Sequence, residues 1–129
     1  MMTNTKMSVF NRYKVQSTGE IVYKRHIIDE VFWDDARGVN RNAGYENADS
    51  VNVYIPFDKN DLSKFVEAKQ YDGTGWTFQN GDYIVKGKVD IQEVSKIKEL
   101  SDYEVFEITL IDVKDFGSSN MQHFEIRGK

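Results

Sequence analysis

Apolar and polar residues alternate along much of the chain, which is the pattern of β-strands that have one face in a core. Residues 50–57 are the clearest case, because every second side chain from Val51 to Phe57 is apolar. Pro56 has no amide hydrogen to donate to a neighbouring strand. We therefore expect this strand to lie at a sheet edge or to end at the proline.

Residues 20–33 are the longest candidate strand. Apolar side chains recur on one of its faces, but the charged residues Arg25 and Asp29 interrupt that face. Long strands of this kind bend or bulge and serve two parts of a sheet. Residues 9–15 precede it as a shorter strand, and the Ser-Thr-Gly sequence at 17–19 favours a hairpin between the two.

Residues 75–89 carry the most distinctive turn signal. Asn80-Gly81 favours the positive φ angles of a tight hairpin turn, and a strand rich in aromatic and β-branched residues follows it. Gly87 lies within that strand, where a glycine marks a bulge or a sharp corner. This stretch predicts the corner of a compact β-barrel.

The C-terminal part returns to β chemistry. Residues 103–113 carry apolar side chains on both faces, which predicts a strand that is buried on both sides. A polar turn at 115–120 follows, and 121–127 is the last predicted strand, with Phe124 and Ile126 facing inward.

Two segments depart from alternation. Apolar residues recur at every third position from Ile91 to Leu100, and Asp90 followed by Glu93 resembles a capping box. These features predict a short helix over about 90–100. Residues 61–70 also fit a short amphipathic helix, with Asp61 as its cap.

These elements predict a mainly β fold, a small antiparallel β-barrel or sandwich of five to seven strands with one or two short helices. The 129 residues fit a single domain, 1–129, and a hydrophobic fraction of 40% is enough for a core. Residues 1–7 are polar, and we expect a flexible arm there.

Composition excludes several classes of protein. The formal net charge of −4 gives no overall attraction to nucleic acid or to an anionic membrane. The absence of cysteine excludes disulfides, thiolate metal sites and cysteine nucleophiles. No apolar run approaches the roughly 18 residues of a membrane helix, and the first residues lack the apolar run of a signal peptide. We expect a protein that stays inside the cell or is assembled there into something larger.

No residue pattern predicts a catalytic, cofactor-binding or metal site. The two histidines, His26 and His123, lie on separate predicted strands without the spacing of metal ligands. Acidic pairs such as Asp34-Asp35 occur, but among 21 acidic residues a chance pair is expected. The serines lack the context of a nucleophile. We therefore expect no enzyme, no cofactor and no small-molecule substrate.

The best candidate functional element is the segment 34–49, which is long for a connection inside a domain. Arginine and tyrosine are favoured at protein interfaces because they anchor contacts at modest entropic cost. Composition alone leaves two readings open, an interface loop and a merely flexible one. The candidate interface residues are Arg37, Asn40, Arg41 and Tyr45, together with His123 on the last strand.

A second hypothesis is a barrel that binds single-stranded nucleic acid. Aromatic side chains flanked by Lys86 and Lys88 would form its stacking platform. The aromatic residues are Tyr45, Tyr54, Tyr71, Trp76, Phe78 and Tyr83. The net negative charge opposes this hypothesis, and most such aromatics belong to cores or interfaces.

Four segments, taken in order, resemble small proteins encoded near the head and tail genes of prophages in Gram-positive bacteria. The segments are 32–38 (FWDDARG), 48–56 (ADSVNVYIP), 80–87 (NGDYIVKG) and 115–126 (DFGSSNMQHFEI). An early strand pair, a tryptophan, a long loop, an apolar strand and a Gly-Asp-Tyr-x-Val hairpin are similar to the pattern of head–tail connector proteins, also called stopper or joining proteins.

This resemblance implies a small β-barrel that acts as a ring between portal and tail of a bacteriophage. The implied partners are further copies of the chain, portal or adaptor proteins and tail proteins, with at most transient contact with packaged DNA. The implied location is the virion, assembled in the host cytoplasm. The segment 58–77 and the predicted helix at 90–100 depart from the simplest joining-protein pattern. Another virion component, such as a tail-completion or decoration protein, therefore stays open.

Overall fold

The computed structural model describes residues 2–35 and 50–129. It contains seven strands and three short 3-10 helices, and all neighbouring strands are antiparallel, which confirms the mainly β fold. The strands are β1 (Thr5–Lys14), β2 (Ile21–Asp35), β3 (Val51–Pro56), β4 (Tyr83–Lys86), β5 (Glu93–Val94), β6 (Val105–Lys114) and β7 (His123–Gly128). The 3-10 helices are η2 (Phe57–Lys59), η3 (Ala68–Gln70) and η4 (Ile97–Leu100).

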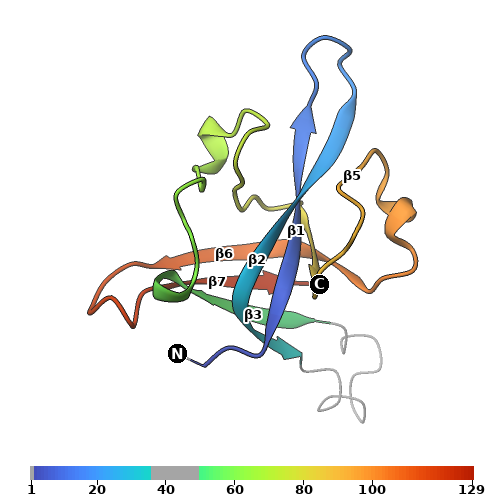
Figure 1. The fold of residues 1–129 in the computed structure, drawn as a ribbon. Coiled ribbons are helices and arrows are strands. Elements are labelled where there is room, and N and C mark those ends of the chain that lie inside the picture. Colours follow the sequence, from blue (N-terminus) through green and yellow to red (C-terminus); the bar gives the residue numbers. More distant parts are fainter. Residues whose placement is uncertain (1, 36–49) are drawn as a thin grey trace.

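The strands form one sheet that closes on itself. Its order is β1-β4-β6-β7-β3-β2-β5, and an additional pairing between β1 and β2 joins the two sides. Figure 1 shows the crossed arrangement, in which the β1–β2 pair lies across the β6, β7 and β3 strands. Closure removes most of the free strand edges that a sheet would otherwise expose.

β2 serves two parts of the sheet, as its interrupted apolar face predicts. Its first part pairs with β1, in a register that runs from Lys14–Ile21 to Thr5–Val31. Its last residues, 32–35, pair with β3 instead. β3 lies between β2 and β7, so it is not an edge strand, and it ends at Pro56 as expected.

The core fills the interior of this closed sheet. The largest cluster joins residues of nearly every strand with Trp76 and Phe78, whose side chains are 1% and 4% exposed. A second, smaller cluster around Phe10, Val94 and Leu100 lies beside β5 and η4. Burying aromatic side chains of this size contributes much of the stability of a small domain.

The two predicted helices do not form. Residues 90–100 contain the short strand β5 and the four-residue η4. In residues 61–70, the only regular element is η3, and the residues before it belong to no helix or strand. Tertiary contacts explain the three-residue period without a helix. Val94 lies in strand β5 and Leu100 lies in η4, and both side chains are buried, whereas Ile91 is 36% exposed.

The turn at 80–82 forms, but not as a hairpin between two strands. The amide of Asp82 donates to the carbonyl of Gln79 at 3.1 Å, and Gly81 has a φ of 92°. Residues 76–78 before the turn belong to no strand, and β4 pairs with β1 and β6 instead. Gly87, with a φ of 86°, follows the last residue of β4 and turns the chain at the predicted corner.

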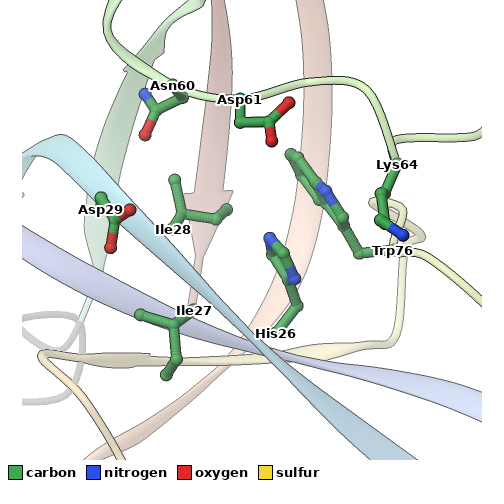
Figure 2. Close-up of a pocket in the computed structure, with 8 residues that line it drawn as sticks. All are labelled: His26, Ile27, Ile28, Asp29, Asn60, Asp61, Lys64 and Trp76. Carbon is green, nitrogen blue, oxygen red and sulfur yellow. The ribbon is translucent and has the colours of Figure 1, made fainter.

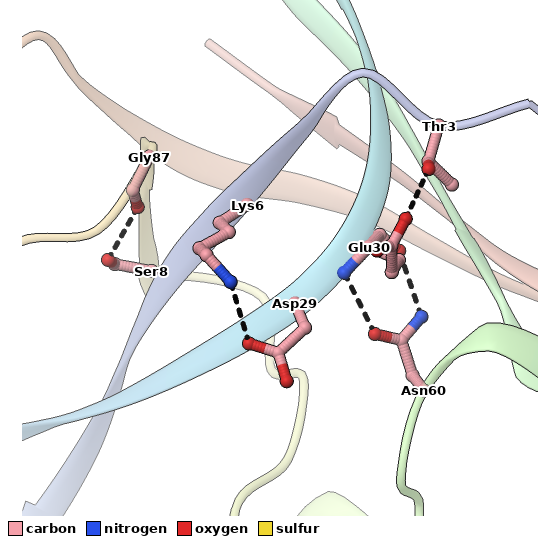
Figure 3. Close-up of polar contacts among 7 residues, drawn as sticks. All are labelled: Thr3, Lys6, Ser8, Asp29, Glu30, Asn60 and Gly87. Carbon is pink, nitrogen blue, oxygen red and sulfur yellow. Dashed lines mark hydrogen bonds and ion pairs between the residues drawn. The ribbon is translucent and has the colours of Figure 1, made fainter.

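Most of the N-terminal arm predicted at 1–7 is ordered. β1 begins at Thr5, and Met7 is fully buried. Asn4 exchanges two hydrogen bonds with the backbone of Trp33, at 2.8 and 3.1 Å. Figure 3 shows two further links from this segment to β2: the hydroxyl of Thr3 donates to Glu30, and the ammonium of Lys6 lies 3.2 Å from a carboxylate oxygen of Asp29.

Candidate functional site

The β6–β7 hairpin extends beyond the closed part of the sheet. β4 pairs with β6 only over Val105–Glu107, and Ile108 then makes two backbone hydrogen bonds with residues 81 and 82. From Thr109 to Lys114, β6 pairs with β7 alone among the described residues. Figure 1 shows the two strands running together to a free end at the turn 115–122. One backbone edge of β6 is therefore open to a partner.

This hairpin also carries most of the large exposed apolar side chains of the described chain. Leu110 and Val113 are 48% and 47% exposed, and Phe116 and Met121 at the turn are 70% and 62% exposed. The prediction that residues 103–113 are buried on both faces is therefore wrong for their second half. Beyond Ile108 the strand has left the closed sheet, so Leu110 on its outer face is not covered by the described chain, and Val113 on the opposite face, beside Phe124, is only partly covered.

A groove of about 560 Å³ lies between the inner face of the hairpin and the segment 57–78. Its walls are mainly apolar and aromatic. They are formed by Phe57, Leu62, Phe65, Ala68, Phe78, Ile111, Val113 and Phe124, with Thr77 as the one neutral polar residue. Glu67 and Asp115 are the charged residues of the lining, and both are acidic. Apolar concavities with a few placed polar groups are typical of binding sites.

Loop chemistry explains how the segment 57–78 comes to form one wall of this groove. Val66 donates to the carbonyl of Trp76 at 2.9 Å, and Trp76 donates to the carbonyl of Lys64 at 3.1 Å. Gly75 lies at this crossing with a φ of 73°, and a Cβ atom there would stand 2.3 Å from the carbonyl oxygen of Lys64. Only glycine permits such an approach of two backbones.

His123, one of the predicted interface residues, lies at the start of β7 in a polar cluster of the hairpin. Its Nδ1 lies 2.8 Å from the carbonyl oxygen of Met121, and its Nε2 lies 3.8 Å from a carboxylate oxygen of Glu125. Its ring centroid lies 6.1 Å from that of Tyr54 on β3. Its side chain is only 17% exposed, so most of its surface contacts the hairpin and β3 and little of it is available to a partner.

The other predicted interface residues, Arg37, Asn40, Arg41 and Tyr45, lie outside the described residues, as does most of the segment 34–49. Sequence reasoning missed the groove, whose walls come from segments far apart in the chain. It also missed the exposed turn, for which there is a signal in Phe116 and Met121, two large apolar residues that flank a run of polar ones.

A second, smaller pocket of about 260 Å³ is lined in part by Trp76 (Figure 2). The ring of His26 stacks on the indole of Trp76, with centroids 4.6 Å apart and planes 7° from parallel. Asp29, Asp61 and Lys64 are the charged residues of its lining. Burial lowers the pKa of His26 below its usual 6.5, although the two aspartates act in the opposite direction. Burial therefore favours the neutral imidazole, which packs on the indole of Trp76.

Beside the groove, a buried polar network ties the segment 76–82 to β1. The side chain of Asn11 donates to the carbonyl of Thr77 at 2.7 Å and accepts from its amide at 3.1 Å. Asn11 also donates to Asp82 at 2.9 Å, and the amide of Arg12 donates to the same carboxylate at 3.0 Å. Burial nevertheless raises the pKa of Asp82 above its usual 3.8, while these hydrogen bonds favour the charged form.

Among the described residues, the aromatic side chains proposed as a platform for nucleic acid do not gather on one surface, and Tyr45 lies outside these residues. Trp76 and Phe78 are core residues, and the ring of Tyr71 packs against that of Tyr13 at 6.2 Å. Tyr54 lies on a different part of the sheet, next to Phe32 and His123. Within the described ranges, no group of three acidic or histidine side chains is placed to hold a metal ion, and no helix is long and apolar enough to cross a membrane.

Comparison with known proteins places the chain in a family. Residues 2–129 match the model of a family described as a family of unknown function, DUF6751. The chain belongs to DUF6751. Searches of curated proteins and of solved structures gave no match. Membership in DUF6751 therefore covers nearly the whole chain and leaves its function to be argued from the surface described above.

Proposed function

We propose that this member of DUF6751 is a non-enzymatic structural subunit of a bacteriophage virion, a head–tail connector that forms a ring between portal and tail. The single observation that carries the proposal is the β6–β7 hairpin, with its open β6 edge, its exposed apolar side chains and its apolar groove. The order of sequence segments that resembles connector proteins gives the proposal its biological setting.

The hairpin supports an assembly role because such a surface is costly to leave in water. Exposed apolar patches on soluble proteins mark interaction sites, and an unpaired strand edge is a template for another chain. The closed part of the sheet supplies the rigid body from which the hairpin extends. Ring subunits need both features, a body that keeps its shape and elements that reach a neighbour.

The proposed partners are further copies of the chain, portal or adaptor proteins and tail proteins, and the proposed location is the virion after assembly in the host cytoplasm. The net charge of −4 suits a ring that DNA passes without adhering, because carboxylates repel phosphates. A tail-completion or decoration protein would use the same hairpin, and the experiment below separates these positions. The nucleic-acid hypothesis has lost the support of Trp76 and Phe78, which are buried.

The test is to locate the protein in phage particles. Particles are induced from a lysogen that carries the gene, purified and analysed by quantitative mass spectrometry and by immunogold electron microscopy. We expect the chain at a copy number near that of the portal and gold labels at the neck. Labels along the head or at the tail tip would assign a different virion part. Absence of the chain from intact particles would refute a virion role.

A further inference from the structure

The end of the β1–β2 hairpin is the second element that projects from the body. Figure 1 shows it extending away from the crossed strands, at the opposite end of β1 from the N-terminus. The turn is closed by the amide of Val15, which donates to the carbonyl of Glu20 at 2.8 Å. Between residues 12 and 24 this hairpin carries three cationic side chains and one carboxylate, although the whole chain has a net charge of −4.

The strand register places two of these cations on one face with an aliphatic residue. Lys14 pairs with Ile21 and Arg12 pairs with Tyr23, and paired residues of adjacent strands point to the same side. Arg12 and Lys14 are exposed, and Ile21 is half-buried. The hairpin end therefore presents one aliphatic side chain flanked by two positive charges.

The groove beside the β6–β7 hairpin has the complementary character. Its walls are apolar, and its charged lining residues are the carboxylates of Glu67 and Asp115. Neither carboxylate makes an ion pair with another described residue. Complementary charges around an apolar contact steer the encounter and fix its register.

We propose that the end of the β1–β2 hairpin of one copy docks in this groove of the next copy. Ile21 enters the apolar groove, and Arg12 and Lys14 face Glu67 and Asp115. The inference rests on the proposed ring and identifies the contact that closes it. It joins two different surfaces of the same chain, so it is a heterologous contact, which generates rings where the rotation closes.

The first test measures self-association of the full chain by sedimentation velocity and light scattering between 5 and about 500 μM, a range chosen to detect weak interfaces. We expect concentration-dependent association. Lys14→Glu and Asp115→Lys should each weaken it at least about tenfold, a change of roughly 1.4 kcal/mol. The combined variant restores an opposite-charge pair and should return the affinity to within about threefold of the starting chain. Lys98→Glu, an exposed charge reversal on η4, is the matched control and should have no effect.

A second measurement identifies the contact directly. Equal amounts of isotopically light and heavy chain are mixed and treated with a carbodiimide, which links amines to carboxylates in contact. We expect mixed-isotope crosslinks between Lys14 and Glu67 or Asp115. A chain that stays monomeric throughout the concentration range, or one that associates without these crosslinks and without response to the charge reversals, overturns the proposed contact.

These outcomes are distinct from those of the virion experiment. Association that ignores the charge reversals removes the docking contact and leaves the connector role standing. Association that follows the charge pattern, in a chain absent from phage particles, keeps the contact and refutes the virion role.

Discussion

The network around Asn11 and the β6–β7 hairpin both come from β-rich sequence. They differ in whether the backbone groups that have no paired strand find a partner within the molecule. Around Asn11, the amide and carbonyl of Thr77, which belongs to no strand, are satisfied by a side chain of the same molecule. Along β6 from Thr109 to Lys114, no described residue of the chain supplies the missing partner, and Leu110 and Val113 stay exposed.

The difference separates a region whose polar groups are satisfied within the molecule from a region whose strand edge and apolar side chains are left uncovered. Buried polar groups are costly unless they are paired, so the Asn11 region depends on every one of its contacts. The exposed apolar groups on the hairpin contribute little to the stability of the fold, and their burial against a partner would favour association. Substitutions in the first region should therefore affect stability, and substitutions in the second should affect binding.

The largest contrast should come from removing one aromatic side chain in each region. Trp76→Ala deletes a core side chain that is 1% exposed, and we expect a loss of about 3–5 kcal/mol in the free energy of unfolding. Phe116→Ala removes a side chain that is 70% exposed and should stay within about 0.5 kcal/mol. Urea unfolding followed by circular dichroism measures both. Equal losses would contradict the division between the two regions.

The next contrast tests the polar network itself. Asn11→Ala leaves the amide and carbonyl of Thr77 without their partner, and orphaned buried groups cost roughly 1–3 kcal/mol each. We expect a loss of about 3 kcal/mol. The control is Asn120→Ala in the exposed hairpin turn, where the amide side chain accepts only from Ser118. A loss below about 1 kcal/mol for Asn11→Ala would show that the pairing is dispensable.

Glycines allow a smaller, matched comparison. Gly75 and Gly117 both have positive φ angles, of 73° and 85°, so alanine costs roughly 1–2 kcal/mol at either position from the backbone alone. At Gly75 the new Cβ also meets the carbonyl oxygen of Lys64 at 2.3 Å, whereas at Gly117 the nearest atom is the sulfur of Met121 at 3.7 Å. We expect Gly75→Ala to be clearly the more destabilising of the two in thermal unfolding.

The smallest effect concerns pH. Burial favours neutral His26 in the folded state, so its folded pKa lies below 6.5 while the unfolded chain titrates near that value. The unfolded state then binds more protons, and stability falls as the pH drops from 6.5 through the folded pKa. Imidazole resonances followed by NMR report the folded pKa. His26→Gln should flatten this part of the pH–stability curve, and an unchanged curve would contradict the role of His26.

Local alternation was sufficient to predict the β fold, the two-part role of β2 and the end of β3 at Pro56. It failed where the burial of a side chain depends on the length of the neighbouring strand. Val113 is as apolar as Val105, but β4 accompanies β6 only from residue 105 to residue 107 and does not reach residue 113. The same limit explains the missing helix, because Val94 and Leu100 are buried by contacts with distant segments rather than by a helical face.

The groove lay beyond prediction for a related reason. Phe57 reaches the hairpin because it follows β3, which pairs with β7, whereas Phe65 lies next to the crossing at Gly75, more than fifty residues before Phe124 in the sequence. The exposed aromatic side chain at the hairpin turn could have been predicted, because Phe116 is next to a glycine in a run of polar residues. A large apolar residue in a predicted turn is a signal for an interface that sequence reading can use.

The place of β7 in the sheet has a consequence for how the protein is made. β7 is the last strand in the sequence, yet it lies between β3 and β6, with hydrogen bonds to both. Until residues 123–128 have left the ribosome, a growing chain has two unfilled strand edges and a core without Phe124 and Ile126. Closure is then a late event between segments distant in sequence, which slows folding.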